Sequence, residues 1–142
     1  MHHIPYKRLS VLCGNLFNFE IGEETIENTL ETGYQKGMPI VKKILKRIKT
    51  YPWIGTDETG VKINGKNWWQ WVWQNTIGAY FVIAKGRGLG IVDKYFGHDY
   101  LGILVHDCLA AHNNTLTAGG HQLCLVHIFR DLIFDIEFEH QK

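Results

Sequence analysis

Residues 53–73 read WIGTDETGVKINGKNWWQWVW, and this stretch decides the fold. Asn64-Gly65 lies between two extended runs, and this dipeptide is typical of the two-residue type I′ turn that joins antiparallel strands. Tryptophan recurs at every second position from Trp69 to Trp73, which gives the returning strand one strongly apolar face. The stretch therefore predicts a hairpin of two strands over residues 53–63 and 68–73.

Downstream of the hairpin, the pattern predicts a mixed α/β (α+β) domain. A third strand is expected over residues 79–84, and the apolar run Leu101–Val105 predicts a buried strand. The remaining elements are expected as helix 89–96, helix or turn 107–112, strand 121–126 and helix 129–138. This order, β-β-β-α-β-α-β-α, is that of a ribonuclease H-like fold. Its mixed five-stranded sheet places the first and fourth strands side by side.

Upstream of the hairpin, the pattern is helical. Apolar residues recur at spacings of three and four over residues 5–17, and a turn at 18–22 precedes a short helix over 25–30. A third helix is expected after Pro39. We therefore divide the chain into a helix-turn-helix-like region, 1–50, and a mixed α/β core, 51–142. A plain helical hairpin is the alternative for the first two helices.

The third expected helix is strongly basic. From Lys36 to Lys49 the chain carries six basic residues and no acidic one. Such a helix suits the phosphates of a nucleic-acid backbone, although a solvated helix face gives the same pattern. A membrane-surface helix is less favoured, because the apolar side lacks Trp and Phe. Candidate DNA contacts are Lys42, Lys43, Lys46, Arg47, Lys49 and, outside the helix, Arg87.

Composition excludes several classes of protein. The chain has 142 residues, 45% of them hydrophobic, and a net charge of +1, so it should fold, but its overall charge indicates no partner. Its three cysteines do not suit a disulfide scaffold, which favours a reducing compartment and hence the cytoplasm. The first residues lack the pattern of a secretory signal, and no apolar run approaches the roughly 20 residues that span a membrane.

Two aspartates occupy positions where a carboxylate needs a partner. Asp57 lies inside the first strand, and Asp107 directly follows the apolar strand run. If the first and fourth strands lie side by side, Asp57 and Asp107 come close together. Adjacent carboxylates repel unless a divalent cation lies between them, and oxygen ligands suit Mg²⁺ or Mn²⁺, two of which can drive phosphoryl transfer. For Asp107, a helix N-cap is the alternative.

Two other motifs suggest different chemistry. Gly86-x-Gly88-x-Gly90 resembles the fingerprint of a nucleotide-binding α/β domain, but Ile91 occupies the position that needs glycine or alanine. A second motif has spacings that suit zinc but lacks an evident fourth ligand, so core packing is its favoured role: His121, Cys124 and His127.

Seven short motifs in chain order resemble those of one protein family. They are IGTDETGV (54–61), NGK (64–66), WV (71–72), RG (87–88), GILVHD (102–107), AAHN (110–113) and HQLCLVHIFRDL (121–132). Together they resemble the central part of transposases of insertion sequence family sixty-six, and the resemblance covers most of the chain. Such proteins are DDE transposases with a ribonuclease H-like catalytic core.

The resemblance implies DNA transposition, in which the enzyme cuts and joins insertion-sequence DNA by metal-assisted phosphoryl transfer. By motif, Asp57 and Asp107 match the first two catalytic aspartates and would bind Mg²⁺ or Mn²⁺ in a two-metal site. Candidate supporting residues are Glu58, His127 and Arg130. The implied partner is DNA at the insertion-sequence ends, with a homo-oligomer as a candidate state of the transposition complex.

The sequence departs from the family's pattern in several places. Cys108 replaces the glycine of a Ser-Asp-Gly-like triplet, and His112 stands where a tyrosine is common. In this family the third carboxylate lies in an Ala-Glu-Arg motif, which does not occur here. Glu137 and Glu139, near the end of the chain, are weak candidates for this carboxylate. We therefore expect a core that ends before the third carboxylate and is inactive alone. The alternative is a non-catalytic DNA-binding remnant or a regulatory fragment.

Overall fold

The structure is a computed structural model that describes residues 4–115 and 119–139. It divides into two compact units, Met1–Val41 and Lys42–Lys142. The boundary between these two units falls inside a helix, Glu23–Ile48. Within the described residues, no helix combines the length and the apolarity that crossing a bilayer requires.

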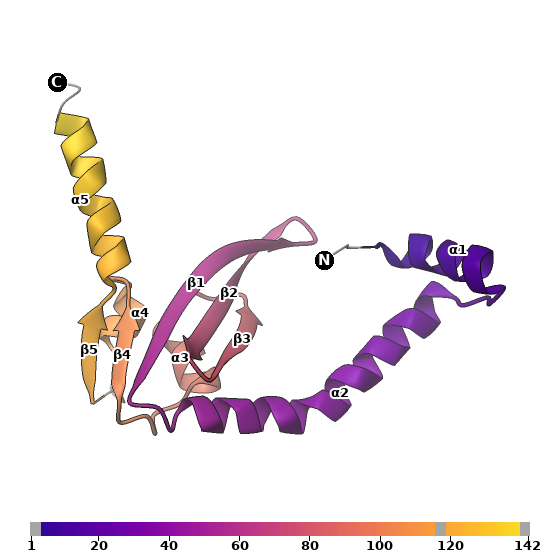
Figure 1. The fold of residues 1–142 in the computed structure, drawn as a ribbon, viewed down its shortest axis with the longest axis horizontal. Helices are drawn as coiled ribbons and strands as arrows, with labels where there is room; N and C mark the ends of the chain where they lie inside the picture. The colour runs from indigo at the N-terminus through magenta and orange to yellow at the C-terminus, as the bar shows by residue number, and fades with distance from the viewer. Residues whose placement is uncertain (1–3, 116–118, 140–142) are drawn as a thin grey trace. The chain divides into compact units, whose positions relative to one another are not determined.

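A five-stranded mixed sheet forms the centre of the second unit (Figure 1). The strand order is β3-β2-β1-β4-β5, with antiparallel pairing among the first three strands of the chain and parallel pairing of β4 with β1 and β5. The predicted mixed sheet and the adjacency of the first and fourth strands are therefore confirmed. The strands are β1 Trp53–Ile63, β2 Lys66–Asn75, β3 Gly78–Ala84, β4 Ile103–His106 and β5 Gly120–Leu123.

The hairpin between β1 and β2 has the predicted turn. Asn64 and Gly65 have φ angles of 49° and 73°, which is the left-handed backbone that a type I′ turn requires at both central residues. The turn sets the register, and Val61 pairs with Trp68. That register sends Trp71 and Trp73 into the core, where both are fully buried.

The core of the second unit lies between one face of the sheet and two helices, α3 (Leu89–Tyr95) and α4 (Ala110–Asn113). Trp73 stacks between aromatic rings, with the Phe96 ring 5.5 Å away at an interplanar angle of 7°. On the other face of the sheet, Phe81 and Ile103 remain 57% and 44% exposed. The predicted buried strand, β4, lies between β1 and β5; its Leu104 and His106 are buried, whereas Ile103 is exposed.

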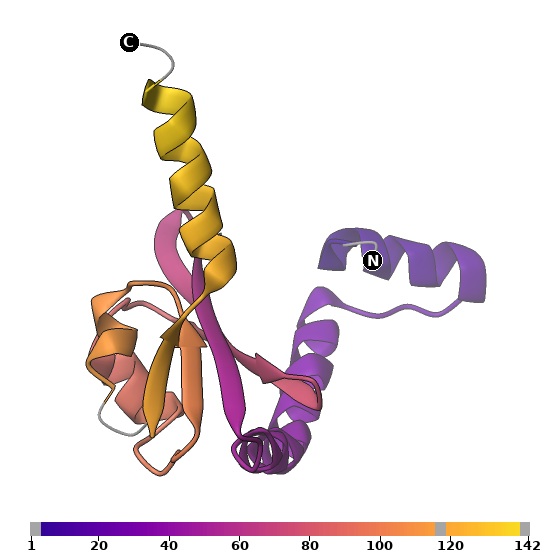
Figure 2. The same ribbon diagram turned by 60° about the vertical axis from the view of Figure 1, so that its left-hand side comes forward.

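The last strand and helix meet earlier in the chain than predicted. β5 ends at Leu123, and α5 spans Leu125–Glu139 (Figure 2). The Cys124 amide donates to the His106 carbonyl at 2.7 Å, and the Cys124 carbonyl then accepts from the first turn of α5. Most apolar side chains of α5 are exposed, and they lie around the whole helix: Leu125, Val126, Phe129, Leu132, Ile133, Phe134, Ile136 and Phe138.

The N-terminal region has two helices rather than the three predicted. α1 spans Tyr6–Phe17 and ends at Asn18, whose φ of 49° gives a left-handed C-cap. α2 spans Glu23–Ile48 and continues through Pro39. Proline removes one backbone donor, but the remaining hydrogen bonds keep the 26-residue helix continuous, so Pro39 does not begin a new helix.

Candidate metal and active site

Asp107 lies directly after β4, at the carboxyl end of that strand. Its Oδ1 accepts a hydrogen bond from the Leu109 amide at 3.0 Å, which closes the turn that leads into α4. The N-cap of α4 is Leu109, with no side-chain cap hydrogen bond, so the helix N-cap alternative for Asp107 is wrong. One oxygen with a single partner leaves most of the acceptor capacity of the carboxylate for other ligands.

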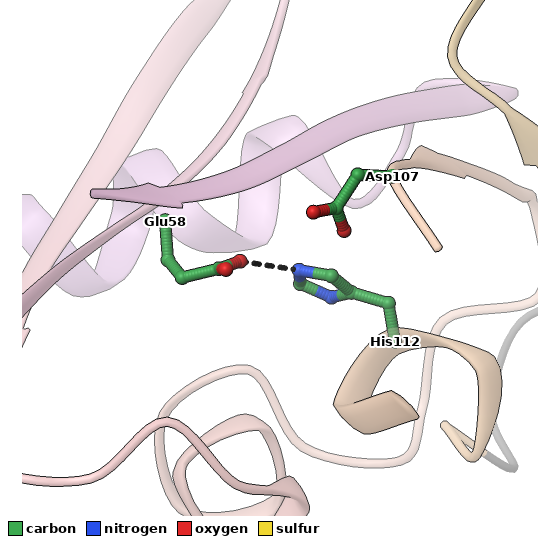
Figure 3. A group of neighbouring side chains, drawn as sticks. All are labelled: Glu58, Asp107 and His112. Carbon is green, nitrogen blue, oxygen red and sulfur yellow. Dashed lines mark hydrogen bonds and ion pairs between the residues drawn. The ribbon is translucent and has the colours of Figure 1, made fainter. Parts of the chain in front are cut away.

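Glu58 and His112 lie beside Asp107 (Figure 3). Glu58 comes from β1 and His112 from α4, and one potential ligand atom from each of the three residues lies within 4.8 Å of the others. Within residues 4–115 and 119–139, this is the one group of three or more His, Cys, Asp or Glu side chains so arranged. The zinc motif at His121 therefore does not assemble as such a group there.

Glu58 is held from two sides. Arg87 donates to its Oε1 from Nε at 2.8 Å and from Nη2 at 2.6 Å, and His112 Nε2 lies 3.1 Å from Oε2. The side chains of Glu58 and His112 have no exposed surface. The guanidinium of Arg87 also lies 4.5 Å from the centre of the Trp69 ring. These contacts fix an ionised carboxylate inside the core.

Asp57 lies outside this group. Ile54, Thr56 and Glu58 are buried, so strand alternation places exposed Asp57 on the other face of β1. Its Oδ1 accepts a hydrogen bond from the Glu58 amide at 2.9 Å. The parallel register runs from Trp53↔Ile103 to Gly55↔Val105, so Asp57 and Asp107 both lie two residues beyond the last pair.

A hollow of about 330 Å³ opens beside Asp107 and brings together several predicted site residues. His127 and Arg130 reach it from α5, and Asp131 does so as well. Asp131 was not predicted, although its spacing of four residues from His127 places both on one helix face. The lining is Arg87, His106, Asp107, Cys108, Leu109, Leu123, Cys124, His127, Ile128, Arg130 and Asp131.

His106 fixes the backbone of Asp107. Its Nδ1 donates to the Asp107 carbonyl, so its Nε2 is left to accept from His121 Nδ1 at 2.9 Å. Burial lowers the pKa of His106, which agrees with a neutral ring in this arrangement. The two rings therefore form a short hydrogen-bonded chain that ends at the strand terminus carrying Asp107.

The remaining predicted residues are less closely placed. Glu137 is exposed on α5 and does not line the hollow, and the Glu139 side chain lies outside what the structure describes. Lys49 bonds to Asp99 and to the Phe96 carbonyl, and it lowers the pKa of Asp99. The other predicted DNA contacts on α2 are exposed: Lys42, Lys43, Lys46 and Arg47.

The glycine-rich step at residues 86–90 does not form a dinucleotide-binding unit. It leads from β3, an edge strand paired antiparallel with β2, into α3. β3 is not adjacent to β4, the strand that follows the helix. The βαβ geometry that places a pyrophosphate at such a loop joins neighbouring parallel strands.

Comparison with known proteins identifies a family for this chain. A search of curated proteins found no match. The family described as Transposase IS66 family matches residues 1–141, essentially the whole chain. The match spans both β1 and β4, with Asp57 and Asp107, and the helices before them. The chain therefore belongs to the IS66 family of transposases, whose function is transposition.

Proposed function

We propose that the chain is part of a DDE transposase that cuts and joins insertion-sequence DNA by metal-assisted phosphoryl transfer, with Asp57 and Asp107 as two of the metal ligands and the third carboxylate supplied by another segment. One observation carries the proposal. β1 and β4 pair in parallel, and the two aspartates lie at the same distance beyond the last pair, Gly55↔Val105. Asp107 lies at the carboxyl end of β4, where open α/β sheets place their sites, and Asp57 lies on the neighbouring strand β1.

The donors of this pair suit Mg²⁺ or Mn²⁺. Asp57 and Asp107 each have one oxygen bonded to a single backbone amide, so free lone pairs remain on both carboxylates. Hard oxygen donors with room for water are the ligands that both ions prefer. When bound, such ions supply activation of a water or 3′ hydroxyl and stabilisation of the leaving oxygen.

Basic and hydrogen-bonding groups near Asp107 would hold the DNA strand. Arg87, His127 and Arg130 line the same hollow as Asp107, and a guanidinium is a strong partner for phosphate. The exposed basic residues of α2 would add contacts that do not depend on sequence. A homo-oligomer that joins two insertion-sequence ends is part of the proposal.

A cleavage assay on duplexes that carry the element's terminal repeats tests this function. With Mg²⁺ or Mn²⁺, the Asp57→Asn and Asp107→Asn chains should each lose product formation by at least about 100-fold, because each change removes a metal ligand. Asp135→Asn, an exposed position on α5, is the matched control and should retain the parent rate. Parent-like rates in either test variant would overturn the catalytic assignment.

A non-catalytic DNA-binding or regulatory role is the second candidate. The exposed basic stretch of α2 favours it, because Lys42–Arg47 contains four basic residues and no acidic one. In this case the chain would retard the same duplexes but cut none of them with either ion. Binding without any metal-dependent product would therefore select the second role over the first.

A further inference from the structure

We propose that Glu58, Asp107 and His112 form a binding site for one divalent transition-metal ion. The site shares Asp107 with the proposed catalytic pair but does not depend on Asp57. It differs in chemistry, because one of its three ligands is an imidazole nitrogen. It also draws on three separate elements, β1, the end of β4, and α4.

The spacing of the donor atoms suits a single ion. Ligand atoms lie about 2.0–2.2 Å from such an ion, so two ligands of one ion are at most roughly 4.4 Å apart. The donor atoms of this group lie within 4.8 Å of one another. A shift of a few tenths of an ångström therefore brings all three onto one ion, and Figure 3 shows Asp107 and Glu58 converging on the same edge of His112.

The charge of the group leaves room for a cation. Two carboxylates, Glu58 and Asp107, lie close together, and one guanidinium, that of Arg87, is paired with Glu58. One negative charge is then left without a partner inside a largely buried group, and such a charge is costly unless a cation meets it. A divalent ion bound by both carboxylates meets it directly.

The surroundings hold the ligands ready. Arg87 occupies Oε1 of Glu58, so Oε2 remains directed at His112. The Trp71 ring packs against the His112 ring, with centres 5.4 Å apart and an interplanar angle of 75°. His106 anchors the carbonyl of Asp107. Ligands fixed in this way bind an ion with little further loss of side-chain freedom.

His112 can release the nitrogen that an ion needs. Its Nε2 contacts Glu58, whereas its buried Nδ1 has no hydrogen-bond partner among the described residues. Moving the ring proton from Nε2 to Nδ1 therefore breaks no bond at Nδ1. The half-buried Asp107 connects the group to the hollow, which provides an entry path.

The mixed ligand set determines the preferred ion. Mg²⁺ requires oxygen ligands and gives up its water reluctantly, whereas imidazole nitrogen favours first-row transition ions. We therefore expect Mn²⁺ to bind this site in preference to Mg²⁺, and Zn²⁺ to displace Mn²⁺ according to the usual affinity order.

Mn²⁺ itself is the probe, and pulsed electron paramagnetic resonance on the full chain is the test. The bound ion should show coupling to one ¹⁴N nucleus and should survive about a 100-fold excess of Mg²⁺. His112→Gln should abolish that coupling and weaken Mn²⁺ binding by at least about tenfold. His98→Gln, an exposed histidine paired with Asp93, is the control and should change neither.

Several outcomes would overturn the site. Bound Mn²⁺ without nitrogen coupling, or unchanged affinity in His112→Gln, would do so. If His112→Gln does not fold, Asp107→Asn decides: a folded variant with parent-like affinity and nitrogen coupling refutes the site, and at least a tenfold loss supports it. Asp57→Asn must keep the coupling. Loss of DNA cleavage in that variant, with the coupling retained, separates this site from the proposed catalytic pair.

Discussion

Arg87 donates two hydrogen bonds to the same oxygen of Glu58, with Nε 2.8 Å and Nη2 2.6 Å from Oε1. The Glu58 side chain is fully buried, whereas 44% of the Arg87 side chain is exposed. A buried carboxylate is tolerated only when its charge is met, so this pair ties β1 to the loop before α3.

Replacing Arg87 with methionine should lower the free energy of unfolding by about 2–3 kcal/mol. Removing one partner of a fully buried pair costs about 3–5 kcal/mol, and water that reaches the exposed side of this pair reduces that cost. Chemical denaturation measures the change. Adding Glu58→Gln should recover most of the loss, because the side chain at position 58 then carries no charge that needs Arg87. A loss below about 0.5 kcal/mol in Arg87→Met would contradict the assignment.

Tyr100→Phe should destabilise the fold by about 0.5–1.5 kcal/mol. The Tyr100 hydroxyl lies 3.1 Å from the Tyr51 carbonyl and 3.3 Å from the Ile103 carbonyl, and the residue is only 1% exposed. Those acceptors lose their donor in the variant. Equilibrium denaturation near neutral pH gives the difference, and a neutral or stabilising change would refute it.

The same tyrosine should make stability fall at alkaline pH. Burial raises the pKa of Tyr100 above its ordinary value of 10.0. A tyrosine whose pKa is higher in the folded than in the unfolded state contributes to the stability of the fold. That contribution is fully present below about pH 10 and is lost as the pH rises through the folded-state pKa. Denaturation of parent and Tyr100→Phe at about pH 9 and about pH 11 isolates this contribution. The difference in the free energy of unfolding between the parent and Tyr100→Phe should be smaller at the higher pH. A constant difference would exclude the effect.

Gly65→Ala should cost about 1–2 kcal/mol, because φ at this residue is +73° and a Cβ is strained in that conformation. Gly60→Ala is the matched control in β1, since φ there is not left-handed and a new Cβ meets nothing within 4 Å. Thermal or denaturant unfolding of both variants should separate them. Equal effects at the two positions would show that the turn tolerates the side chain.

Removing four basic residues from α2 should weaken DNA binding and lower its salt dependence. Each phosphate contact that is lost reduces the slope of log affinity against log salt by about 0.9. Fluorescence anisotropy at several salt concentrations measures both quantities. The variant replaces Lys42, Lys43, Lys46 and Arg47 with alanine.

A control of equal charge change is available outside α2. It replaces the exposed residues Lys62, Lys66, Lys85 and Lys94 with alanine. If the two variants lose the same affinity, net charge rather than the α2 surface explains binding.

The sequence predicts the sheet well, because local signals determine its hairpin. Asn64-Gly65 fixes the turn, and alternating tryptophans fix the buried face. The helical region was harder to predict, since a single Pro39 suggested a boundary that the rest of α2 overrides. Propensity at one residue is a weak guide when a long helix is otherwise continuous.

The candidate site was only partly predictable. Strand parity could have shown that Glu58 shares the buried face of Ile54, whereas Asp57 does not. His112 could not be found in this way, because it meets Glu58 across 54 positions through the packing of α4. Asp107 could be identified from the sequence, because it directly follows an apolar strand run. The catalytic role of Asp57 and Asp107 stays a prediction.

The apolar surface of α5 has a practical consequence. Phe129, Phe134 and Phe138 are each more than half exposed, and neighbouring aliphatic side chains continue the surface around the helix. Salts such as sulfate strengthen apolar association, so we expect them to favour contacts between the exposed α5 surfaces of separate molecules. We therefore expect buffers low in such salts to limit self-association of the purified protein during spectroscopy. A dye that fluoresces on apolar surfaces can check, before each measurement, that this surface is still exposed.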